Sequence, residues 1–207
     1  MPKKLIVGLG NPGPEYAQTR HNLGWLVVEA LAKRGNASFR EERSMHCLLA
    51  DIRVEHEQVL LALPTTYMNE SGRAVQAVAQ YFKIPLTSIL LIQDELDFGF
   101  GTFAFREGGG NAGHNGIASI YEQTGTTQFA RLRMGIGRPV APLTPKDYVL
   151  QRFSPSEQTG MPKLLERAAE AAECWVRDGL TKTMNLWNGS RYDAAESTPD
   201  LGSDRLM

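Results

Sequence analysis

The apolar residues of this chain follow two alternating patterns, short uninterrupted runs and longer stretches at helical spacing. Leu5-Ile6-Val7 is a run of the kind that fills a strand buried on both faces. Glycines and prolines between residues 8 and 14 then force a tight turn. Apolar residues at helical spacing follow over residues 23–31, and Gly35 ends them. The N-terminal stretch therefore predicts a strand, a glycine-rich turn and a helix whose first turn carries His21.

The same two patterns continue through the middle of the chain. Two apolar runs on either side of the polar residues 55–57 predict a β-hairpin. Strands and helices are then predicted in alternation: a helix from about 69 that ends before Pro85, a strand over 88–93, a helix over 114–123 and a strand over 131–137. We expect the apolar strand over 88–93 to be central in the sheet.

The C-terminal part is predicted to be helical and then to lose order. Residues 154–157, Ser-Pro-Ser-Glu, have the capping-box pattern with proline at the first helical position. Gly160 and Pro162 are candidate breaks in the helical region that follows. Because the sequence contains no repeat and no linker that would divide the chain, we expect one α/β domain over residues 1–191. The polar residues 192–207 are expected to form a disordered tail.

Composition narrows the class of protein. The chain has 207 residues, enough for one domain with a substantial core. Its formal net charge of -1 excludes bulk electrostatic attraction to nucleic acid and leaves room for a local basic patch. Cys47 and Cys174 lack metal or redox spacing, which is typical of reduced thiols in a cytoplasmic protein. No apolar run reaches membrane-spanning length and no signal peptide is recognisable, so we expect no membrane partner.

His21 and Asp94 are the first candidates for chemistry. Both follow a predicted strand, and ligands of open α/β sheets bind beyond the carboxyl ends of strands. The positive end of a helix dipole disfavours imidazolium, so we expect the His21 ring to stay neutral and available as a base. Asp94 is placed to accept the other ring proton. The alternatives are a structural histidine and a carboxylate that caps backbone amides.

Three asparagines complete a polar set without an obvious serine or cysteine nucleophile. Asn11, Asn69 and Asn115 each follow a strand or open a helix, and singly each fits a cap or turn residue. Neutral amides beside a neutral base suit attack of water on an acyl carbon. The four histidines of the chain show no close metal-ligand spacing, so we expect no catalytic metal.

Two glycine-rich segments allow other interpretations. Gly8, Gly10 and Gly13 fit the dinucleotide fingerprint, but prolines surround the third glycine and the next strand belongs to a hairpin. A nucleotide-binding oxidoreductase therefore stays a rival hypothesis. The second segment, residues 106–116, is either a surface loop or a mobile wall that approaches a ligand.

Five separated motifs resemble those of bacterial peptidyl-tRNA hydrolases. They occur in the family's order: VGLGNPGPEYAQTRHNLG (7–24), PTTYMNESG (64–72), DELD (94–97), GGGNAGHNG (108–116) and RLRMGIGRP (131–139). The resemblance implies a single-domain α/β fold with a mixed, largely parallel twisted sheet flanked by helices. It also implies a monomeric, cytoplasmic esterase without a cofactor, which releases the peptide from peptidyl-tRNA that has left the ribosome.

The resemblance also implies roles for individual residues. His21 becomes the catalytic base, Asp94 its orienting partner, and Asn11 a catalytic residue that holds peptide and water. The implied contacts to the peptide, the acceptor stem and the 3′ end are Tyr16, Tyr67, Asn69, Asn115, Arg106 and Arg133, with the two arginines near the 5′ phosphate. Ala112 and Arg106 stand where the family usually has glycine and lysine. A non-catalytic tRNA-binding protein is the second rival hypothesis.

Overall fold

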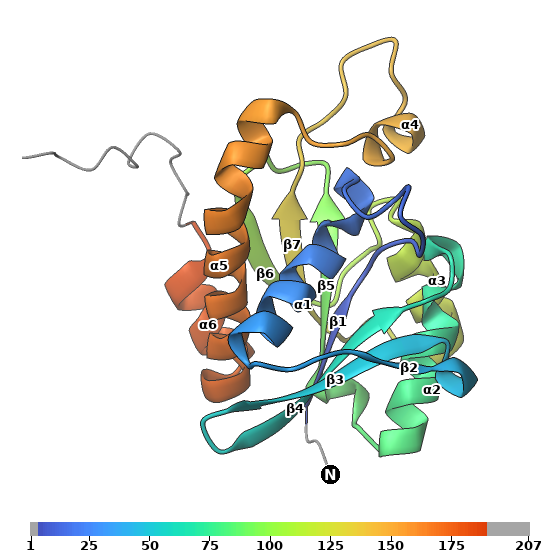
Figure 1. Ribbon diagram of the computed structural model, residues 1–207, viewed down its shortest axis with the longest axis vertical. Coiled ribbons are helices and arrows are strands. Elements are labelled where there is room, and N and C mark those ends of the chain that lie inside the picture. Colours follow the sequence, from blue (N-terminus) through green and yellow to red (C-terminus); the bar gives the residue numbers. More distant parts are fainter. Residues whose placement is uncertain (1–3, 190–207) are drawn as a thin grey trace, which may run out of the picture.

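The computed structural model describes residues 4–189 (Figure 1), so the tail predicted over 192–207 lies outside the described residues. Seven strands form one sheet in the order β2-β3-β4-β1-β5-β7-β6. Their bounds are β1 Lys4–Gly8, β2 Arg40–Glu42, β3 Cys47–Val54, β4 Glu57–Pro64, β5 Ile89–Glu95, β6 Phe103–Glu107 and β7 Ala130–Gly135. The predicted single-domain α/β class with a mixed sheet is confirmed.

The centre of the sheet is parallel and its two edges are antiparallel. β1 pairs in parallel with β4 and with β5, and β5 pairs in parallel with β7. The predicted hairpin is β3–β4, while β2 and β6 add antiparallel edge strands. The predicted central strand is β5, which is buried along its whole length. The ends of β1 and β5 therefore open at the same edge of the sheet.

Helices cover both faces of this sheet, as Figure 1 shows. The α-helices are α1 Leu23–Arg34, α2 Ser71–Phe82, α3 Asn115–Thr124, α4 Pro145–Val149, α5 Pro155–Asp178 and α6 Leu180–Trp187. Short 3₁₀ turns precede several elements, at η1 Arg20–Asn22, η2 Arg43–Met45, η3 Met68–Glu70 and η4 Leu86–Ser88. α1 and α5 pack on one face of the sheet, and α2 and α3 pack on the other. α4 stands apart, beyond the carboxyl ends of β5 and β7.

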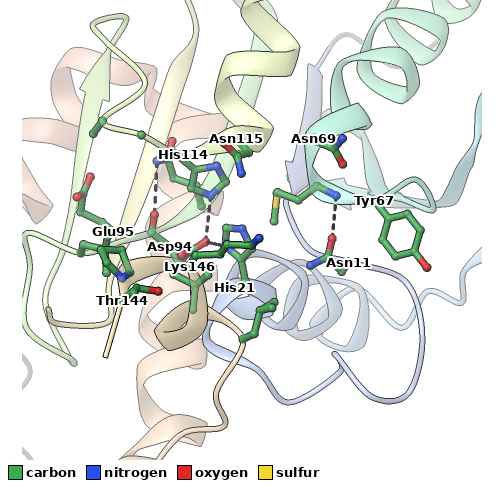
Figure 2. Close-up of a pocket in the computed structure, with 18 residues that line it drawn as sticks. Asn11, His21, Tyr67, Asn69, Asp94, Glu95, His114, Asn115, Thr144 and Lys146 are labelled. Atoms are coloured by element: carbon green, nitrogen blue, oxygen red, sulfur yellow. Dashed lines mark hydrogen bonds and ion pairs between the residues drawn. The ribbon is translucent and has the colours of Figure 1, made fainter. Parts of the chain in front are cut away.

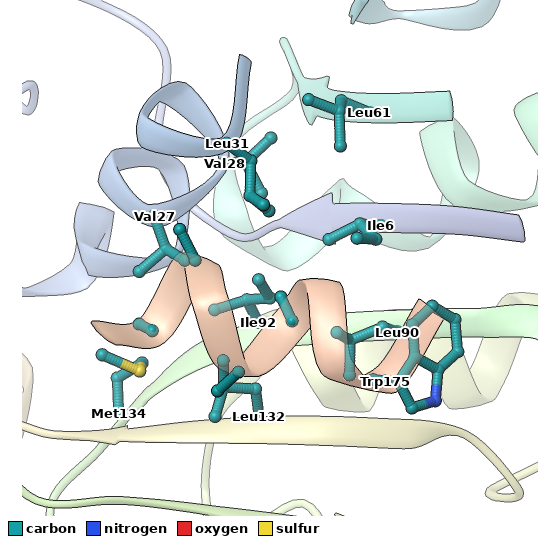
Figure 3. Packing of buried hydrophobic residues seen from close by; sticks show 14 of the residues in the cluster. Ile6, Val27, Val28, Leu31, Leu61, Leu90, Ile92, Leu132, Met134 and Trp175 are labelled. Carbon is teal, nitrogen blue, oxygen red and sulfur yellow. The ribbon is translucent and has the colours of Figure 1, made fainter. Parts of the chain in front are cut away.

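The alternation of side chains along β1 divides the core into two layers. Ile6 faces α1 and α5 together with Leu90 and Ile92 of β5 (Figure 3). Leu5 and Val7 face α2 and α3 on the opposite side of the sheet. Burying one such aliphatic side chain contributes roughly 1.5–3 kcal/mol. The parallel strands are thus apolar on both faces, which is why their sequences read as uninterrupted apolar runs.

Close contact between β1 and α1 depends on two glycines. A Cβ atom on Gly8 would lie 2.4 Å from the carbonyl oxygen of Gly24, and one on Gly24 would lie 2.3 Å from the carbonyl oxygen of Ile92. Neither distance is compatible with a side chain, so α1 rests directly on the strand ends. This contact brings the start of α1 and the preceding turn η1 to the edge where β1 and β5 end.

Some elements differ from the prediction. β2, β6, α4 and α6 were not predicted, because they are short or belong to segments rich in glycine and proline. The proposed break at Pro162 is wrong, since α5 continues through this residue. Pro162 is exposed, so water can reach the carbonyl group that loses its helical partner, while the opposite side of α5 stays anchored in the core. No helix within residues 4–189 is both long and apolar enough to cross a membrane.

Candidate active site

A cavity of about 760 Å³ opens at the carboxyl edge of β1 and β5 (Figure 2). Its lining comes from six parts of the fold: the turn after β1, η1, the end of β5, η3, the start of α3, and α4, with residues that flank them. The polar side chains of the lining are Asn11, His21, Asn69, Gln93, Asp94, Glu95, His114, Asn115, Thr144 and Lys146. Five of the predicted site residues, His21, Asp94 and the three asparagines, are therefore in one cavity, and Tyr67 lines it too.

His21 and Asp94 are joined by a hydrogen bond. His21 lies in η1, and Asp94 is the last but one residue of β5. The His21 Nδ1 atom is 2.8 Å from Oδ1 of Asp94, and both residues are buried. A carboxylate can only accept, so Nδ1 carries the hydrogen and donates it. This tautomer leaves the lone pair of Nε2 for a group in the cavity.

His114 is a second histidine bound to the same carboxylate oxygen. It is the N-cap of α3, where its Nδ1 atom accepts from the backbone N–H groups of Gly116 (3.2 Å) and Ile117 (3.4 Å). Its hydrogen is therefore on Nε2, which donates to Asp94 Oδ1 over 3.0 Å. Figure 2 shows the two imidazole rings next to each other at this carboxylate, with their centroids 5.0 Å apart. His114 was not among the site residues predicted from the sequence, although its place at a predicted helix start was a signal for it.

The electrostatics of the pair correct one expectation. Burial lowers the pKa of His21, but the charge of Asp94 and its hydrogen bond outweigh burial, so the pKa is raised above its ordinary value. From the helix dipole we expected a shift of this pKa in the opposite direction. That expectation was wrong because Asp94 is in direct contact, and its full charge exceeds the partial charge of a helix end. Burial raises the pKa of Asp94, but the two imidazoles hold it well below its usual range.

The donor atoms of His21, Asp94 and His114 lie within 4.8 Å of one another, close enough for a metal ion. The hydrogen bonds of His114 argue against this use. Its Nδ1 atom already accepts two backbone N–H groups, so Nε2 keeps its hydrogen and offers no lone pair. The donor set therefore fits a hydrogen-bonded network and does not fit a metal centre.

Asn11 is held in a fixed orientation by two contacts. Its side-chain oxygen accepts the backbone N–H of Met68 over 2.8 Å. Asn22 bonds to the backbone of Asn11 twice, through its Oδ1 and Nδ2 atoms, each over 2.9 Å. Because the Asn11 oxygen is occupied, its NH₂ group is the part left for a ligand in the cavity. Asn22 was not among the predicted site residues; it bonds to the backbone of Asn11 and does not line the cavity.

The other predicted contacts lie at the rim. Asn69 in η3 and Asn115 at the start of α3 are exposed and line the cavity. Tyr67 is 57% exposed, and its ring meets the ring of Tyr16 edge to face with centroids 6.4 Å apart. Tyr16 is not part of the cavity lining. The tyrosine pair therefore extends the site outward from the asparagines.

The two predicted basic contacts are in different environments. The Arg133 guanidinium pairs with the buried carboxylate of Glu95 over 2.7 Å and lies 4.6 Å from the ring centre of Phe98. Arg106 is exposed on β6, and no carboxylate within residues 4–189 pairs with it. Its guanidinium lies against Gly109, where a Cβ atom would come within 2.7 Å of it. Neither arginine lines the cavity.

A buried arginine holds the glycine-rich segment. Arg131 is 1% exposed, and its guanidinium donates to the carbonyl oxygens of Gly108 (3.3 Å) and Gly110 (2.8 Å). The hydroxyl of Tyr121 donates to the carbonyl oxygen between them, on Gly109, over 2.9 Å. Ala112 stands at the position where the sequence resemblance leads us to expect glycine, and it has a positive φ of 49°. These hydrogen bonds hold residues 108–110, and residues 112–115 of the same segment line the cavity.

The dinucleotide alternative lacks its geometry. The first helix begins at Leu23 and not at the third glycine, and β4 reaches the sheet through an antiparallel hairpin. The space next to Gly10 is occupied by the ring of Trp25, 2.6 Å from where a Cβ atom would lie. The glycines after β1 therefore serve packing and the turn.

Fold and site together are those of an α/β protein with a histidine that is hydrogen-bonded to a buried carboxylate, in a cavity that neutral amides also line. A sequence model of the peptidyl-tRNA hydrolase family matches residues 5–195. The chain belongs to this family.

Individual relatives agree with the family assignment. The peptidyl-tRNA hydrolase of Chloroflexus aurantiacus is 48% identical over 185 residues, which cover 89% of this chain and 98% of the relative. That of Gloeobacter violaceus is 45% identical over 97% of this chain and 100% of its own length. The crystal structure of the Acinetobacter baumannii enzyme has a TM-score of 0.85 at 37% identity and covers 91% of this chain and 95% of that one.

Proposed function

We propose that this chain hydrolyses the ester between a peptide and the terminal ribose of tRNA, with His21 as general base. The hydrogen bond from His21 Nδ1 to Asp94 carries the proposal, because it leaves Nε2 unprotonated toward the cavity. Family membership supports the substrate, and the cavity supports a ligand of the size of a peptide end and a nucleoside.

The proposed reaction uses water as the nucleophile. His21 Nε2 takes a proton from water as its oxygen attacks the ester carbon. Asp94 stabilises the imidazolium that forms, since its carboxylate stays ionised. When the acyl–oxygen bond breaks, the imidazolium returns the proton to the ribose oxygen. The products are a peptide carboxylic acid, which loses the second water proton to solvent, and a tRNA with an intact terminal hydroxyl.

Amide groups are assigned to hold the substrate. The free NH₂ group of Asn11 would donate to the ester carbonyl, where negative charge develops in the transition state. Asn69 and Asn115 would bind the peptide backbone and the 3′ end from the rim, and Tyr67 with Tyr16 would offer an apolar surface beside them. The three asparagines come from different elements, which separates their directions of approach.

The assay that tests this function is incubation with N-acetyl-aminoacyl-tRNA, followed by measurement of released N-acetyl-amino acid. Release with multiple turnovers supports the proposal. Binding without release would support the non-catalytic tRNA-binding protein instead.

We further propose that the protein acts as a monomer in the cytoplasm. One chain supplies every side of the cavity, and two buried free thiols suit a reducing compartment.

Of the two arginines, we assign the main phosphate contact to Arg106, because no carboxylate within residues 4–189 pairs with its charge. Arg133 is already paired with Glu95, so we assign it a weaker contact. Arg106→Ala is expected to raise KM for full-length peptidyl-tRNA and leave kcat near normal, because a distant phosphate is bound equally in ground and transition states. The slope of log affinity against log salt should become shallower by about one unit.

The control for this prediction is an ester of the same peptide with adenosine. This substrate has no phosphate, so its KM should be the same for Arg106→Ala and the unaltered protein. Arg177→Ala removes an exposed arginine that pairs with Asp178 on α5, and it should leave KM unchanged. An equal loss with the adenosine ester would place Arg106 in the fold or the chemistry and contradict the assignment.

Chelation is expected to leave the activity unchanged. The reason is the tautomer of His114, which withholds its Nε2 lone pair from any metal. The measurement is kcat before and after dialysis against EDTA, with zinc added back in a parallel sample. Activity that is lost on dialysis and returns with zinc would refute a metal-free mechanism.

A further inference from the structure

We propose that Arg20 and Tyr148 are positioning residues that hold α4 as a wall of the catalytic cavity and keep His21 in register with that wall. The inference rests on the proposed function for its kinetic consequences. Its structural part, the anchoring of α4, can be tested without any activity.

α4 needs an anchor because it has almost no core of its own. It is five residues long, and none of them is buried. The helix lines the cavity with Pro145, Lys146 and Val149, and its flanking residues Thr144 and Leu150 line it too. A helix this short is not stable alone, so contacts elsewhere must hold it in place. Tyr148 supplies these contacts. Its side chain does not line the cavity and is hydrogen-bonded to the carbonyl oxygen of Ile136.

Tyr148 and Arg20 converge on one carbonyl oxygen. The Tyr148 hydroxyl donates to the carbonyl oxygen of Ile136 over 2.7 Å, and Nη1 of Arg20 donates to the same atom over 3.3 Å. The Arg20 guanidinium also lies over the Tyr148 ring, 4.5 Å from its centre. The two side chains therefore share both an acceptor and a cation–π contact.

Arg20 is itself fixed by a bidentate ion pair. Its two terminal nitrogens donate to the two carboxylate oxygens of Glu157, each over 2.7 Å, and its side chain is 8% exposed. Burial raises the pKa of Glu157, but its hydrogen bonds with Arg20 and Ser154 outweigh burial and lower it, so the carboxylate is ionised. A lysine could keep the charge but could neither make the fork nor stack on the ring.

The contacts of Arg20 and Tyr148 reach the chain neighbours of both His21 and Asp94. Arg20 precedes His21, and its backbone N–H donates to the carbonyl oxygen of Gln151, just after α4, over 2.9 Å. Ile136 donates its N–H to the carbonyl oxygen of Glu95, the residue after Asp94, over 2.9 Å. Movement of α4 would thus be transmitted to the backbone on both sides of the His21–Asp94 hydrogen bond.

The test uses Tyr148→Phe and Arg20→Lys, with Arg34→Lys as the matched control. Arg34, the last residue of α1, makes a similar forked pair with Glu173 of α5 over 3.0 and 3.1 Å, but it does not line the catalytic cavity. All variants are assayed well below their melting temperatures. A loss of stability alone would then leave kcat and KM unchanged.

We expect Tyr148→Phe to raise KM about threefold to tenfold with kcat within twofold, the range set by one lost hydrogen bond. We expect Arg20→Lys to lower kcat by tenfold or more, because a displacement of about 1 Å at a reacting group can cost about 10²-fold. Amide hydrogen exchange over residues 145–151 should accelerate in both variants and stay unchanged in Arg34→Lys.

Two outcomes would overturn the inference. One is unchanged exchange over residues 145–151 in Tyr148→Phe. The other is faster exchange over these residues in Tyr148→Phe while kcat and KM keep the values of the unaltered protein. Tyr148→Phe decides the matter alone if Arg20→Lys does not fold. An unaltered protein that lacks hydrolase activity would refute the proposed function, while the exchange experiment would still decide whether the anchor exists.

Discussion

Replacing His21 by alanine is expected to slow hydrolysis by about 10²- to 10⁴-fold, the usual contribution of a general base. Its Nε2 atom is the only ring nitrogen of the two buried cavity histidines whose lone pair is left for a ligand, since Nε2 of His114 donates to Asp94 and Nδ1 of His114 accepts backbone N–H groups at the start of α3. Substrate affinity should change little, because the imidazole acts on water and the asparagines hold the substrate.

The measurement is the single-turnover rate with saturating enzyme, together with the dissociation constant for peptidyl-tRNA. His56→Ala is the control, since His56 is exposed in the turn between β3 and β4. It should behave like the unaltered protein in both assays. If His21→Ala loses less than a few-fold in the single-turnover rate, another group must be the base.

The second large effect is expected for Asp94→Asn, which keeps the shape of the side chain and removes its charge. The amide can donate to Nδ1 of His21, which would move the ring hydrogen to Nε2 and abolish the base. It would also leave the imidazolium without a partner. We expect kcat to fall by about 10²- to 10⁴-fold while the fold stays intact, as measured by the melting temperature and by kcat.

The pH dependence gives this variant a second readout. Activity requires neutral His21, so kcat/KM should rise with pH through the pKa of His21 and then level off. Asp94 raises that pKa against the effect of burial. Removing the charge should therefore lower the pKa and shift the acidic limb of the residual activity to lower pH. A limb that stays in place would mean that the titrating group is not His21.

Much of the site could be predicted because it lies on locally encoded elements. The apolar run of β1, the turn and the helical spacing after it place Asn11 and His21 at one edge of the sheet. β5 is recognisable in the same way, and its partner β1 is the parallel strand beside it, so Asp94 reaches the same edge. The predicted contact between His21 and Asp94 is present in the structure. Its catalytic role is our proposal.

The remainder depended on contacts that no local pattern contains. His114 meets Asp94 because the start of α3 faces the end of β5, across 20 residues of chain. Arg133 and Arg106 look alike in sequence, yet one is paired with Glu95 and the other is not. α4 joins the cavity through Arg20, which is more than 100 residues away in the chain.

The sequence by itself determined the central strands, the longer helices and the edge of the sheet at which polar residues gather, because periodicity, capping and glycine act over a few residues. The tertiary structure decided the tautomers, the direction of the His21 pKa shift and which arginine is free. Those properties depend on burial and on charges brought within about 3 Å, and only the packing of distant segments creates them.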